Sequence, residues 1–131
     1  MNGKNILITG GAGFIGSNMV EKLLPDNRVT VIDNLNNHVG ERFIRAFKGN
    51  KNLDFINADL LSFDFGTLKN IDVVIHFAAN SDVRYGSEDP EKDFENNVVV
   101  TQNILEYMRK KDVKQILFAS SSTDYSDCLL Q

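Results

Sequence analysis

The sequence predicts an α/β fold in which a doubly wound parallel sheet carries helices on both faces. Three observations support this prediction. Short apolar runs rich in β-branched and aromatic residues recur between turn residues, as expected of strands buried on both faces. Segments with apolar residues at helical spacing alternate with these runs. A glycine-rich turn, from Gly10 to Gly16, joins the first run directly to the first helical segment.

The expected elements follow one another as strands separated by helices. Five strands are predicted at residues 6–8, 29–32, 53–56, 73–77 and 116–118. The helix after the first strand ends at Pro25, and its buried side consists of Ile15, Met19, Val20, Leu23 and Leu24. A long helix before the last strand has Asp89 as its cap and Pro90 as its first residue, and it extends to residues 110–111. Residues 34–52 are expected to form one helix between polar loops.

The composition indicates one globular domain and argues against several kinds of partner. With 131 residues, of which 42% are hydrophobic, the chain can bury a core but has no room for a second domain. A net charge of -4 argues against a nucleic-acid partner. No apolar run resembles a signal peptide or a membrane span, so we expect a cytoplasmic protein that does not bind membranes. Cys128 has no neighbouring Cys or His, and no metal site is predicted.

The glycine-rich turn has the pattern of a dinucleotide-binding loop. It contains Gly-x-Gly-x-x-Gly from Gly11 and Gly-x-x-Gly-x-x-Gly from Gly10, and both patterns end on Gly13 and Gly16. Glycine allows the positive φ angles of a sharp turn and lets a pyrophosphate approach the backbone N–H groups, while the following helix offers its positive N-terminus. An ordinary flexible turn is the alternative. The preceding strand, the following helix and an acidic residue about 20 residues later favour a Rossmann-type cofactor site.

That acidic residue is Asp33, at the end of the second predicted strand. A carboxylate at this position can accept hydrogen bonds from the ribose hydroxyls of an adenosine and would repel a 2′-phosphate, so NAD is favoured over NADP. The alternative is a turn residue or the cap of the next helix. Asn34 and Leu35 offer no basic side chain to a phosphate, whereas Arg42 and Arg45 lie farther along the chain.

Six motifs resemble, in family order, the extended short-chain dehydrogenases/reductases, and among them the nucleotide-sugar epimerases and dehydratases of the UDP-glucose 4-epimerase type. The motifs are residues 9–16 (TGGAGFIG), 33–35 (DNL), 59–60 (DL), 76–79 (HFAA), 96–98 (NNV) and 118–122 (FASSS). The resemblance covers residues 4 to about 123. It implies a Rossmann-type NAD-binding domain over residues 1–123, truncated after about the fifth strand, and a divergent tail over residues 124–131.

The resemblance also implies which residues hold NAD. In the adenosine and phosphate half these are Gly10, Gly13, Phe14, Ile15 and Gly16 beside the pyrophosphate, Asp33 and Asn34 at the ribose, and Asp59 and Leu60 at the adenine. In the nicotinamide half they are Phe77, Ala78 and Ala79 at the end of the fourth strand, and Asn96 in the long helix. The alternatives are a turn cap for Asp59, packing at the strand end for residues 77–79, and a buried polar tie for Asn96. Asn97 and Asn103 are weaker candidates, and His76 is interpreted as a core histidine rather than a base.

Ser121 is the one expected catalytic residue, because it lies four residues before Tyr125 as the family spacing implies. Its hydroxyl would bond the substrate oxygen during hydride transfer. The family's Tyr-x-x-x-Lys, whose lysine lowers the pKa of the tyrosine, comes well beyond this serine, and the sequence ends at Gln131. The chain is therefore expected to be inactive alone.

One Tyr-x-x-x-Lys does occur, from Tyr107 to Lys111, but it precedes the serine and lies in the charged last turn of the long helix. We interpret it as a coincidence. Tyr125 is not a substitute, since the residue four positions later is Leu129. Two alternatives to a truncated enzyme are a non-catalytic NAD-sensing or interaction module, and one half of a split enzyme whose other chain supplies the tyrosine, the lysine and the sugar-binding domain. A nucleotide sugar would bind only in a completed site, and uncovered apolar surface predicts self-association.

Overall fold

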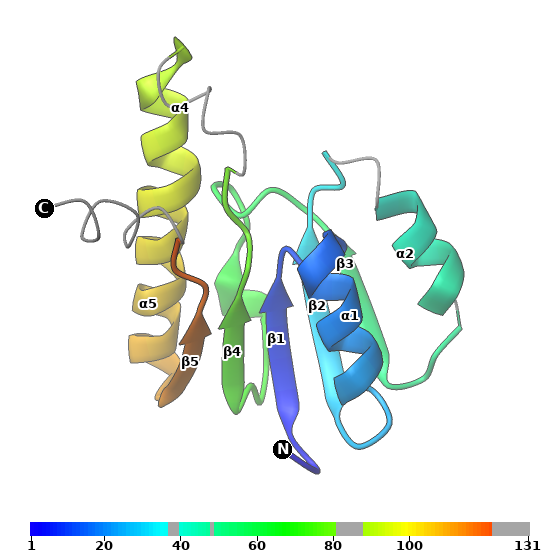
Figure 1. Cartoon of the computed structure of the whole chain (residues 1–131). Helices are drawn as coiled ribbons and strands as arrows, with labels where there is room; N and C mark the ends of the chain where they lie inside the picture. The colour runs from blue at the N-terminus through cyan, green and yellow to red at the C-terminus, as the bar shows by residue number, and fades with distance from the viewer. Residues whose placement is uncertain (37–39, 48, 81–87, 122–131) are drawn as a thin grey trace, which may run out of the picture.

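The computed structural model describes residues 1–36, 40–47, 49–80 and 88–121. The predicted tail, residues 124–131, lies outside this part of the chain, as does Tyr125. The five strands are β1 Asn5–Thr9, β2 Arg28–Asp33, β3 Leu53–Asn57, β4 Val73–His76 and β5 Gln115–Phe118. They form one sheet in the order β3-β2-β1-β4-β5, and every neighbouring pair is parallel (Figure 1). The predicted fold class and the five expected strands are confirmed.

The helices follow the expected alternation. They are α1 Phe14–Leu23, α2 Gly40–Phe47, the 3-10 helix η1 Phe65–Thr67, α4 Pro90–Phe94, the π-helix η2 Glu95–Val99 and α5 Val100–Lys111. The long helix predicted from Asp89 to residue 111 is present as the continuous run α4-η2-α5, with one irregular turn that the sequence did not predict. The Asp89 side chain accepts a hydrogen bond from the Lys92 N–H and Pro90 is the first residue of α4, so the predicted cap is confirmed.

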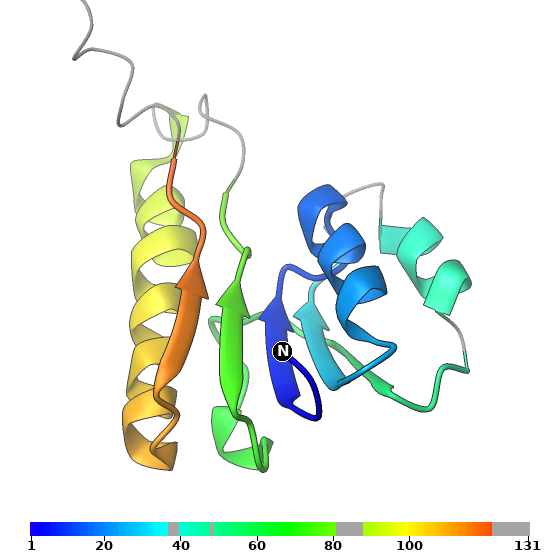
Figure 2. The same ribbon diagram turned by 60° about the horizontal axis from the view of Figure 1, so that its bottom comes forward.

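Alternate residues of the strands face two separate apolar layers. On one face, Ile6 and Ile8 of β1 pack with Val20 of α1 and Phe43 of α2. On the other face, Leu7 packs with a cluster built around α5. Figures 1 and 2 show α1 and α2 together over the β1-β2-β3 half of the sheet, and α4 with α5 beside β4 and β5. Most residues of β1, β2 and β4 are therefore buried on both faces of the sheet, as their nearly continuous apolar sequences predict.

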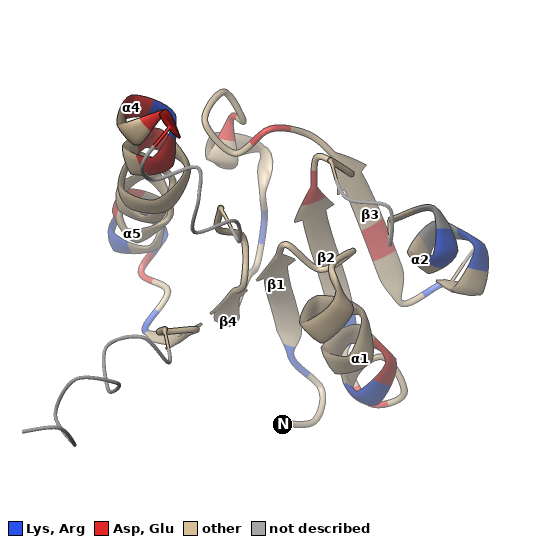
Figure 3. Ribbon diagram, turned by 45° about the horizontal axis from the view of Figure 1, so that its top comes forward, with Lys and Arg blue, Asp and Glu red and all other residues tan. Residues whose placement is uncertain are grey.

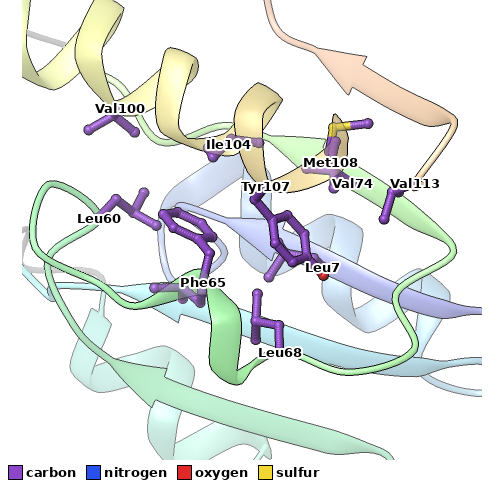
Figure 4. Packing of buried hydrophobic residues seen from close by; sticks show 11 residues of the cluster. Leu7, Leu60, Phe65, Leu68, Val74, Val100, Ile104, Tyr107, Met108 and Val113 are labelled. Carbon is purple, nitrogen blue, oxygen red and sulfur yellow. The ribbon is translucent and has the colours of Figure 1, made fainter. Parts of the chain in front are cut away.

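The α5 layer also fixes the segment between β3 and β4. Figure 4 shows one cluster that contains Leu7, Val74 and four side chains of α5, and the β3–β4 connection contributes Leu60, Phe65 and Leu68 to it. The residues of α5 are Val100, Ile104, Tyr107 and Met108. All these side chains are buried. The connection that leaves the carboxyl end of β3 is thus held in place by core packing, which positions the residues that begin it.

The strand order reverses at β1, which has β2 on one side and β4 on the other. The connection after β1 goes to α1, whereas the long helix that precedes β5 covers the opposite face of the sheet. The helices that follow β1 and β4 in the chain therefore lie on opposite faces of the sheet, although the two strands stay paired to their ends. In open α/β sheets a crevice forms where the order reverses in this way.

Candidate cofactor site at the carboxyl ends of the strands

A cleft of about 1000 Å³ lies at the carboxyl ends of the strands. Every residue that the sequence assigned to NAD lines it: Gly10, Gly13, Phe14, Ile15, Gly16, Asp33, Asn34, Asp59, Leu60, Phe77, Ala78, Ala79 and Asn96. These residues come from five separate stretches of the chain, which only the parallel sheet brings together. The structure thus assembles the predicted set into one concave surface.

The glycine loop is shaped by close backbone packing. Gly10 has a φ of +67°, and a Cβ there would lie 2.6 Å from the Ala78 nitrogen. A Cβ on Gly16 would lie 2.3 Å from the Gly10 oxygen. Both positions therefore exclude any side chain, which agrees with the sequence argument for a tight turn and close helix packing. The loop lies directly against the segment that follows β4.

The N-terminus of α1 is open toward a ligand. Gly13 is its N-cap, and within the described residues no side chain caps it and no acidic residue lies in its first turn. The first N–H groups of a helix need partners from outside it, and the helix dipole favours an anion there. Phe14 and Ile15 in this turn line the cleft with 76% and 64% of their surface exposed, a high value for large apolar side chains. This turn can hold a phosphate beside an apolar surface.

Asp33 connects the end of β2 to the glycine loop. Its Oδ2 accepts a hydrogen bond from the Ala12 N–H at 2.9 Å, and its Oδ1 accepts one from the Leu35 N–H at 2.8 Å. The residue is 6% exposed. A carboxylate has about four acceptor positions, so two bonds leave capacity for ribose hydroxyls. Asp33 is therefore also a turn residue, through its bond to the Leu35 N–H, and this leaves room for the cofactor role.

Asp59 and Leu60 begin the connection after β3. The Asp59 Oδ1 accepts a hydrogen bond from the Leu61 N–H at 2.9 Å. Asp59 thus caps a turn, the alternative to adenine binding that the sequence offered for it. Asp59 is exposed, whereas Leu60 is buried in the α5 layer. The Ala58 N–H donates to the Asp33 backbone oxygen at 3.2 Å, which places the two acidic residues on adjoining strand ends.

Acidic side chains outnumber basic ones among the residues that line the cleft. Figure 3 shows acidic colouring at the carboxyl end of β2 and on α4, and basic colouring on α2. Arg42 and Arg45 of α2 are not among the lining residues, and Lys92 is the one cation among the described residues that line the cleft. A 2′-phosphate near Asp33 would therefore meet negative charge and no arginine from the described part of α2.

The segment after β4 forms the opposite wall. Phe77 and Ala78 are half-buried and Ala79 is exposed. Asn96 on η2 faces the same cleft, and its Nδ2 donates to the Lys92 backbone oxygen at 2.7 Å, so it is tied to its own helix rather than to another element. Asn97 is not among the residues that line the cleft. Its Oδ1 accepts a hydrogen bond from the Asn80 N–H at 2.9 Å and so connects η2 to the segment after β4.

His76 is a buried histidine with satisfied polar groups, as interpreted from the sequence. It is 2% exposed, and its ring nitrogens lie 2.6 Å from the Thr9 Oγ1 and 3.1 Å from the Thr101 Oγ1. Burial lowers the pKa of His76 from 6.5 to about 4. The ring is therefore neutral at pH 7.

The expected catalytic residue is not among the residues that line the cleft. Ser121 follows β5 and is exposed, whereas Ala119, two positions earlier, lines the cleft. Tyr107 is 4% exposed and packs against Phe65 in the core, and burial raises its pKa. A tyrosine that acts as acid and base needs a lowered pKa, so the interpretation of the Tyr107–Lys111 pair as a coincidence is supported.

Several lining residues were missed by the sequence argument. They are Ile32, Asn36, Ala58, Leu61, Asn80, Asp89, Glu91, Lys92, Glu95, Val100 and Ala119. Most are adjacent to predicted residues and could have been included from their position at a strand end. The residues of α4 gave no signal, because their place over the cleft depends on how the long helix packs against the sheet.

The profile of the NAD dependent epimerase/dehydratase family matches residues 6–130. The chain belongs to this family. It is 39% identical over 138 residues to the bifunctional UDP-glucose 4-epimerase and UDP-xylose 4-epimerase 3 of Arabidopsis thaliana, a match that covers 93% of this chain and 38% of that protein. The family match agrees with the resemblance that the six motifs indicated.

Two solved structures share the fold. One is the UDP-N-acetylglucosamine 4-epimerase from Methanobrevibacter ruminantium, in complex with UDP-N-acetylmuramic acid, which superimposes with a TM-score of 0.88 at 34% identity. The match covers 100% of this chain and 43% of the epimerase chain. A mutant UDP-glucuronic acid 4-epimerase from Bacillus cereus, solved with a fluorinated UDP-sugar and NAD, has a TM-score of 0.85 at 33% identity, over 93% of this chain and 41% of its own. The chain thus spans about two fifths of the length of these relatives.

Two further properties concern the described residues alone. No group of three or more His, Cys, Asp or Glu side chains there is arranged to hold a metal ion. No helix in the same part of the chain is long and apolar enough to cross a membrane.

Proposed function

We propose that this chain binds NAD in the cleft at the carboxyl ends of its strands, as the NAD-binding portion of a nucleotide-sugar epimerase or dehydratase of the UDP-glucose 4-epimerase type. One observation carries the proposal: the residues that the motifs assign to NAD line a single cleft at the point where the strand order reverses. The tight glycine loop, in which Gly10 and Gly16 pack against neighbouring backbone, leads into the uncapped N-terminus of α1, and a pyrophosphate fits at that N-terminus.

The proposed positions within the cleft follow the order of its walls. The first turn of α1 would hold the pyrophosphate, Asp33 and Asn34 the adenosine ribose, and residues 59–60 the adenine. The segment 77–79 and Asn96 would adjoin the nicotinamide half. When bound, NAD would supply the hydride acceptor for oxidation of a sugar hydroxyl, while the chain's own residues orient it and exclude water from one side.

Calorimetric titration of the chain with NAD and with NADP tests this proposal. We expect saturable binding of NAD and weaker binding of NADP. Asp33→Asn removes the charge and one acceptor, so we expect NAD affinity to fall about tenfold and the preference for NAD over NADP to shrink. Asp54→Asn is the matched control, because Asp54 is an exposed residue of β3 outside the cleft lining, and it should bind like the parent chain. Absence of saturable NAD binding by the folded chain would refute the proposal.

We further propose that the chain does not turn over a nucleotide sugar by itself, and that Ser121 contributes a hydroxyl only in a site completed by further protein. Ala119 lines the cleft and supports the proposed role of Ser121, because it brings the segment after β5 to the nicotinamide wall. Incubating the NAD-loaded chain with UDP-glucose and following epimer formation tests the first part. Detectable turnover would contradict it.

A second candidate function is a non-catalytic NAD-binding module, or one half of a split enzyme. The observation that favours it is that the described residues contain one tyrosine, Tyr107, and it lies in the core away from the cleft. A pull-down with the NAD-loaded chain discriminates these candidates. A co-purifying protein that restores turnover would indicate a split enzyme, and a partner that binds without turnover would indicate a module.

A further inference from the structure

A buried polar connection runs behind the cleft and involves no residue assigned to NAD by the motifs. Its centre is His76 at the end of β4, held between Thr9 at the end of β1 and Thr101 at the start of α5. The ring of Phe118 covers it from β5 at a centroid distance of 5.6 Å. The Thr9 and His76 side chains are buried. A polar group in such a place is costly unless its hydrogen bonds are made, so the geometry of these contacts decides the state of the ring.

The hydrogen bonds assign the tautomer of His76. The Thr101 hydroxyl donates its single proton to the Asn97 backbone oxygen at 2.5 Å. Toward His76 this oxygen can therefore act only as an acceptor, and the Nε2 of His76 must carry a proton. Since the neutral ring has one N–H, its Nδ1 is unprotonated and accepts from the Thr9 hydroxyl. The donors thus run in one direction, from Thr9 through His76 and Thr101 to Asn97.

The far end of this connection is the irregular turn of the long helix. Asn97 lies in the π-helix η2, next to Asn96, which lines the cleft. The Asn97 side chain accepts from the Asn80 N–H at 2.9 Å and donates to the Asp93 Oδ1 at 2.9 Å. The Asn80 Nδ2 also donates to this Asp93 oxygen, at 2.9 Å. Asn80 closes the wall formed by residues 77–80, so the connection joins that wall to η2.

We propose that His76, held as its Nε2–H tautomer, is a positioning residue of the cofactor cleft: it joins the β1 end beneath the glycine loop to the π-helix turn, and through Asn97 sets the place of the wall at residues 77–80. The expected effect on NAD affinity rests on the proposed NAD function. The tautomer of His76 and the position of residues 77–80 do not depend on it. Isolated π-turns occur often at functional sites, and η2 is the turn that carries both Asn96 and Asn97. The low pKa of His76 agrees with a ring that stays neutral.

Nitrogen NMR of the full chain tests the tautomer. The sequence has two histidines, so His38→Asn leaves one ring to observe. We expect a protonated Nε2 and a bare Nδ1 at pH 7. In Thr101→Val the acceptor for Nε2–H is gone, and we expect the proton to move to Nδ1, where the Thr9 oxygen can accept it. The opposite tautomer in the parent chain, or no change in Thr101→Val, would overturn the assignment.

The positioning role has its own measurement. Hydrogen exchange of the Asn80 amide should speed up in Thr101→Val, because the bond from that amide to Asn97 depends on the turn that Thr101 braces. NAD affinity of the folded variant should fall about three- to tenfold. Ile104→Val is the matched control: Ile104 lies one turn later on α5, is fully buried, and has no polar contact. It should lower the unfolding midpoint while exchange at Asn80 and NAD affinity remain at the parent values.

The outcomes separate this proposal from the proposed function. If the parent chain does not bind NAD, the proposed function fails, while the tautomer and the Asn80 exchange still decide the role of His76. If Thr101→Val only lowers stability, as Ile104→Val does, and leaves Asn80 exchange and NAD affinity unchanged, His76 has a structural role alone and the proposal is wrong.

Discussion

Gly3 and Gly10 share a backbone φ of +67° but have different surroundings. A Cβ on Gly3 would meet nothing within 4 Å, whereas one on Gly10 would lie 2.6 Å from the backbone of Ala78. We therefore expect Gly3→Ala to lower the free energy of unfolding by about 1 kcal/mol, the usual cost of the left-handed conformation. Gly10→Ala should cost at least about 2 kcal/mol more, because backbone must move.

Urea denaturation of the two variants checks this difference, and NAD titration of the folded fraction provides the second readout. Gly3→Ala should bind NAD like the parent chain, since Gly3 is not among the residues that line the cleft. Equal destabilisation by the two substitutions would show that the close contact between the glycine loop and Ala78 is not a property of the protein.

His76 makes stability depend on pH. Its pKa is about 4 in the folded chain, below the ordinary value of 6.5, so the unfolded chain binds a proton more readily. This contribution to stability is complete above pH 6.5 and is lost as the pH falls toward 4, by up to about 1.4 kcal/mol per pH unit and about 3 kcal/mol in all. Its nearest contacts, Thr9, Thr101 and Phe118, are uncharged.

Chemical denaturation between pH 7.5 and pH 4 measures this effect, with His76→Phe as the comparison. This range contains the interval between the ordinary pKa of 6.5 and the folded value of about 4, over which the stability contribution changes. The variant should be less stable at neutral pH because the Thr9 and Thr101 hydroxyls each lose their hydrogen bond to the ring, but its stability should fall less steeply on acidification. Parallel pH curves for the two proteins would contradict the assignment of the transition to His76.

The site residues were predictable to the extent that each carries its signal locally. Gly10 and Gly16 follow the end of β1 at fixed spacing, and Asp33 is the last residue of β2. A parallel sheet brings the carboxyl ends of its strands to one edge, so the meeting of these residues followed from the fold class. The hydrogen bond from Ala12 to Asp33 could not be predicted in this way, because it depends on the distance between two strand ends. The same holds for the bond that joins Asn80 to η2.

At the scale of elements, α4 depends on its cap. The Asp89 side chain accepts from the Lys92 N–H at 3.1 Å, and the helix that follows begins the run leading into η2. Asp89→Ala should lower the free energy of unfolding by about 1 kcal/mol, whereas Asp89→Ser should retain most of the stability, since serine is also a good cap. Urea denaturation of both variants is the measurement, and equal losses would argue against a capping role.

The sequence predicted where elements exist better than how they are built. The strands were recognisable because their residues are apolar on both faces, and Asp89-Pro90 marked a helix start through chemistry that is local to it. The helix expected between residues 34 and 52 is the short α2, and its ends could not be predicted because the sequence is polar on either side of it. The π-helix η2 gave no signal, because apolar spacing over five residues does not distinguish it from an α-helical turn.

At the scale of the whole molecule, the sheet separates a functional edge from a packing surface. The carboxyl ends of all strands face the cleft, while the two apolar layers hold α1 with α2 on one face and α5 on the other. Changes in the layers should therefore alter stability first, and changes at the strand ends should alter ligand binding first. This division is what allows Ile104→Val, in the α5 layer, to serve as the control for a substitution behind the cleft.

The apolar layers cover β5 on one face alone, where Ile116 packs against the α5 layer. Leu117 and Phe118 are 46% and 58% exposed, and β5 forms an edge of the sheet with β4 as its one neighbour. Phe94 and Val98 on the long helix are also exposed, at 57% and 50%. An open strand edge beside exposed apolar side chains is a site of chain–chain association. We expect the isolated chain to self-associate as its concentration rises, which sedimentation velocity measures.

Leu117→Lys should shift the chain toward monomer, because a charge on an edge strand opposes strand pairing and burial. Met1→Lys is the matched control, since Met1 is also 53% exposed but lies at the opposite end of the chain from β5, and it should leave the association unchanged. NAD affinity should be the same in both variants, because neither residue lines the cleft. A parent chain that sediments as a monomer at all concentrations would show that this exposed surface does not drive association.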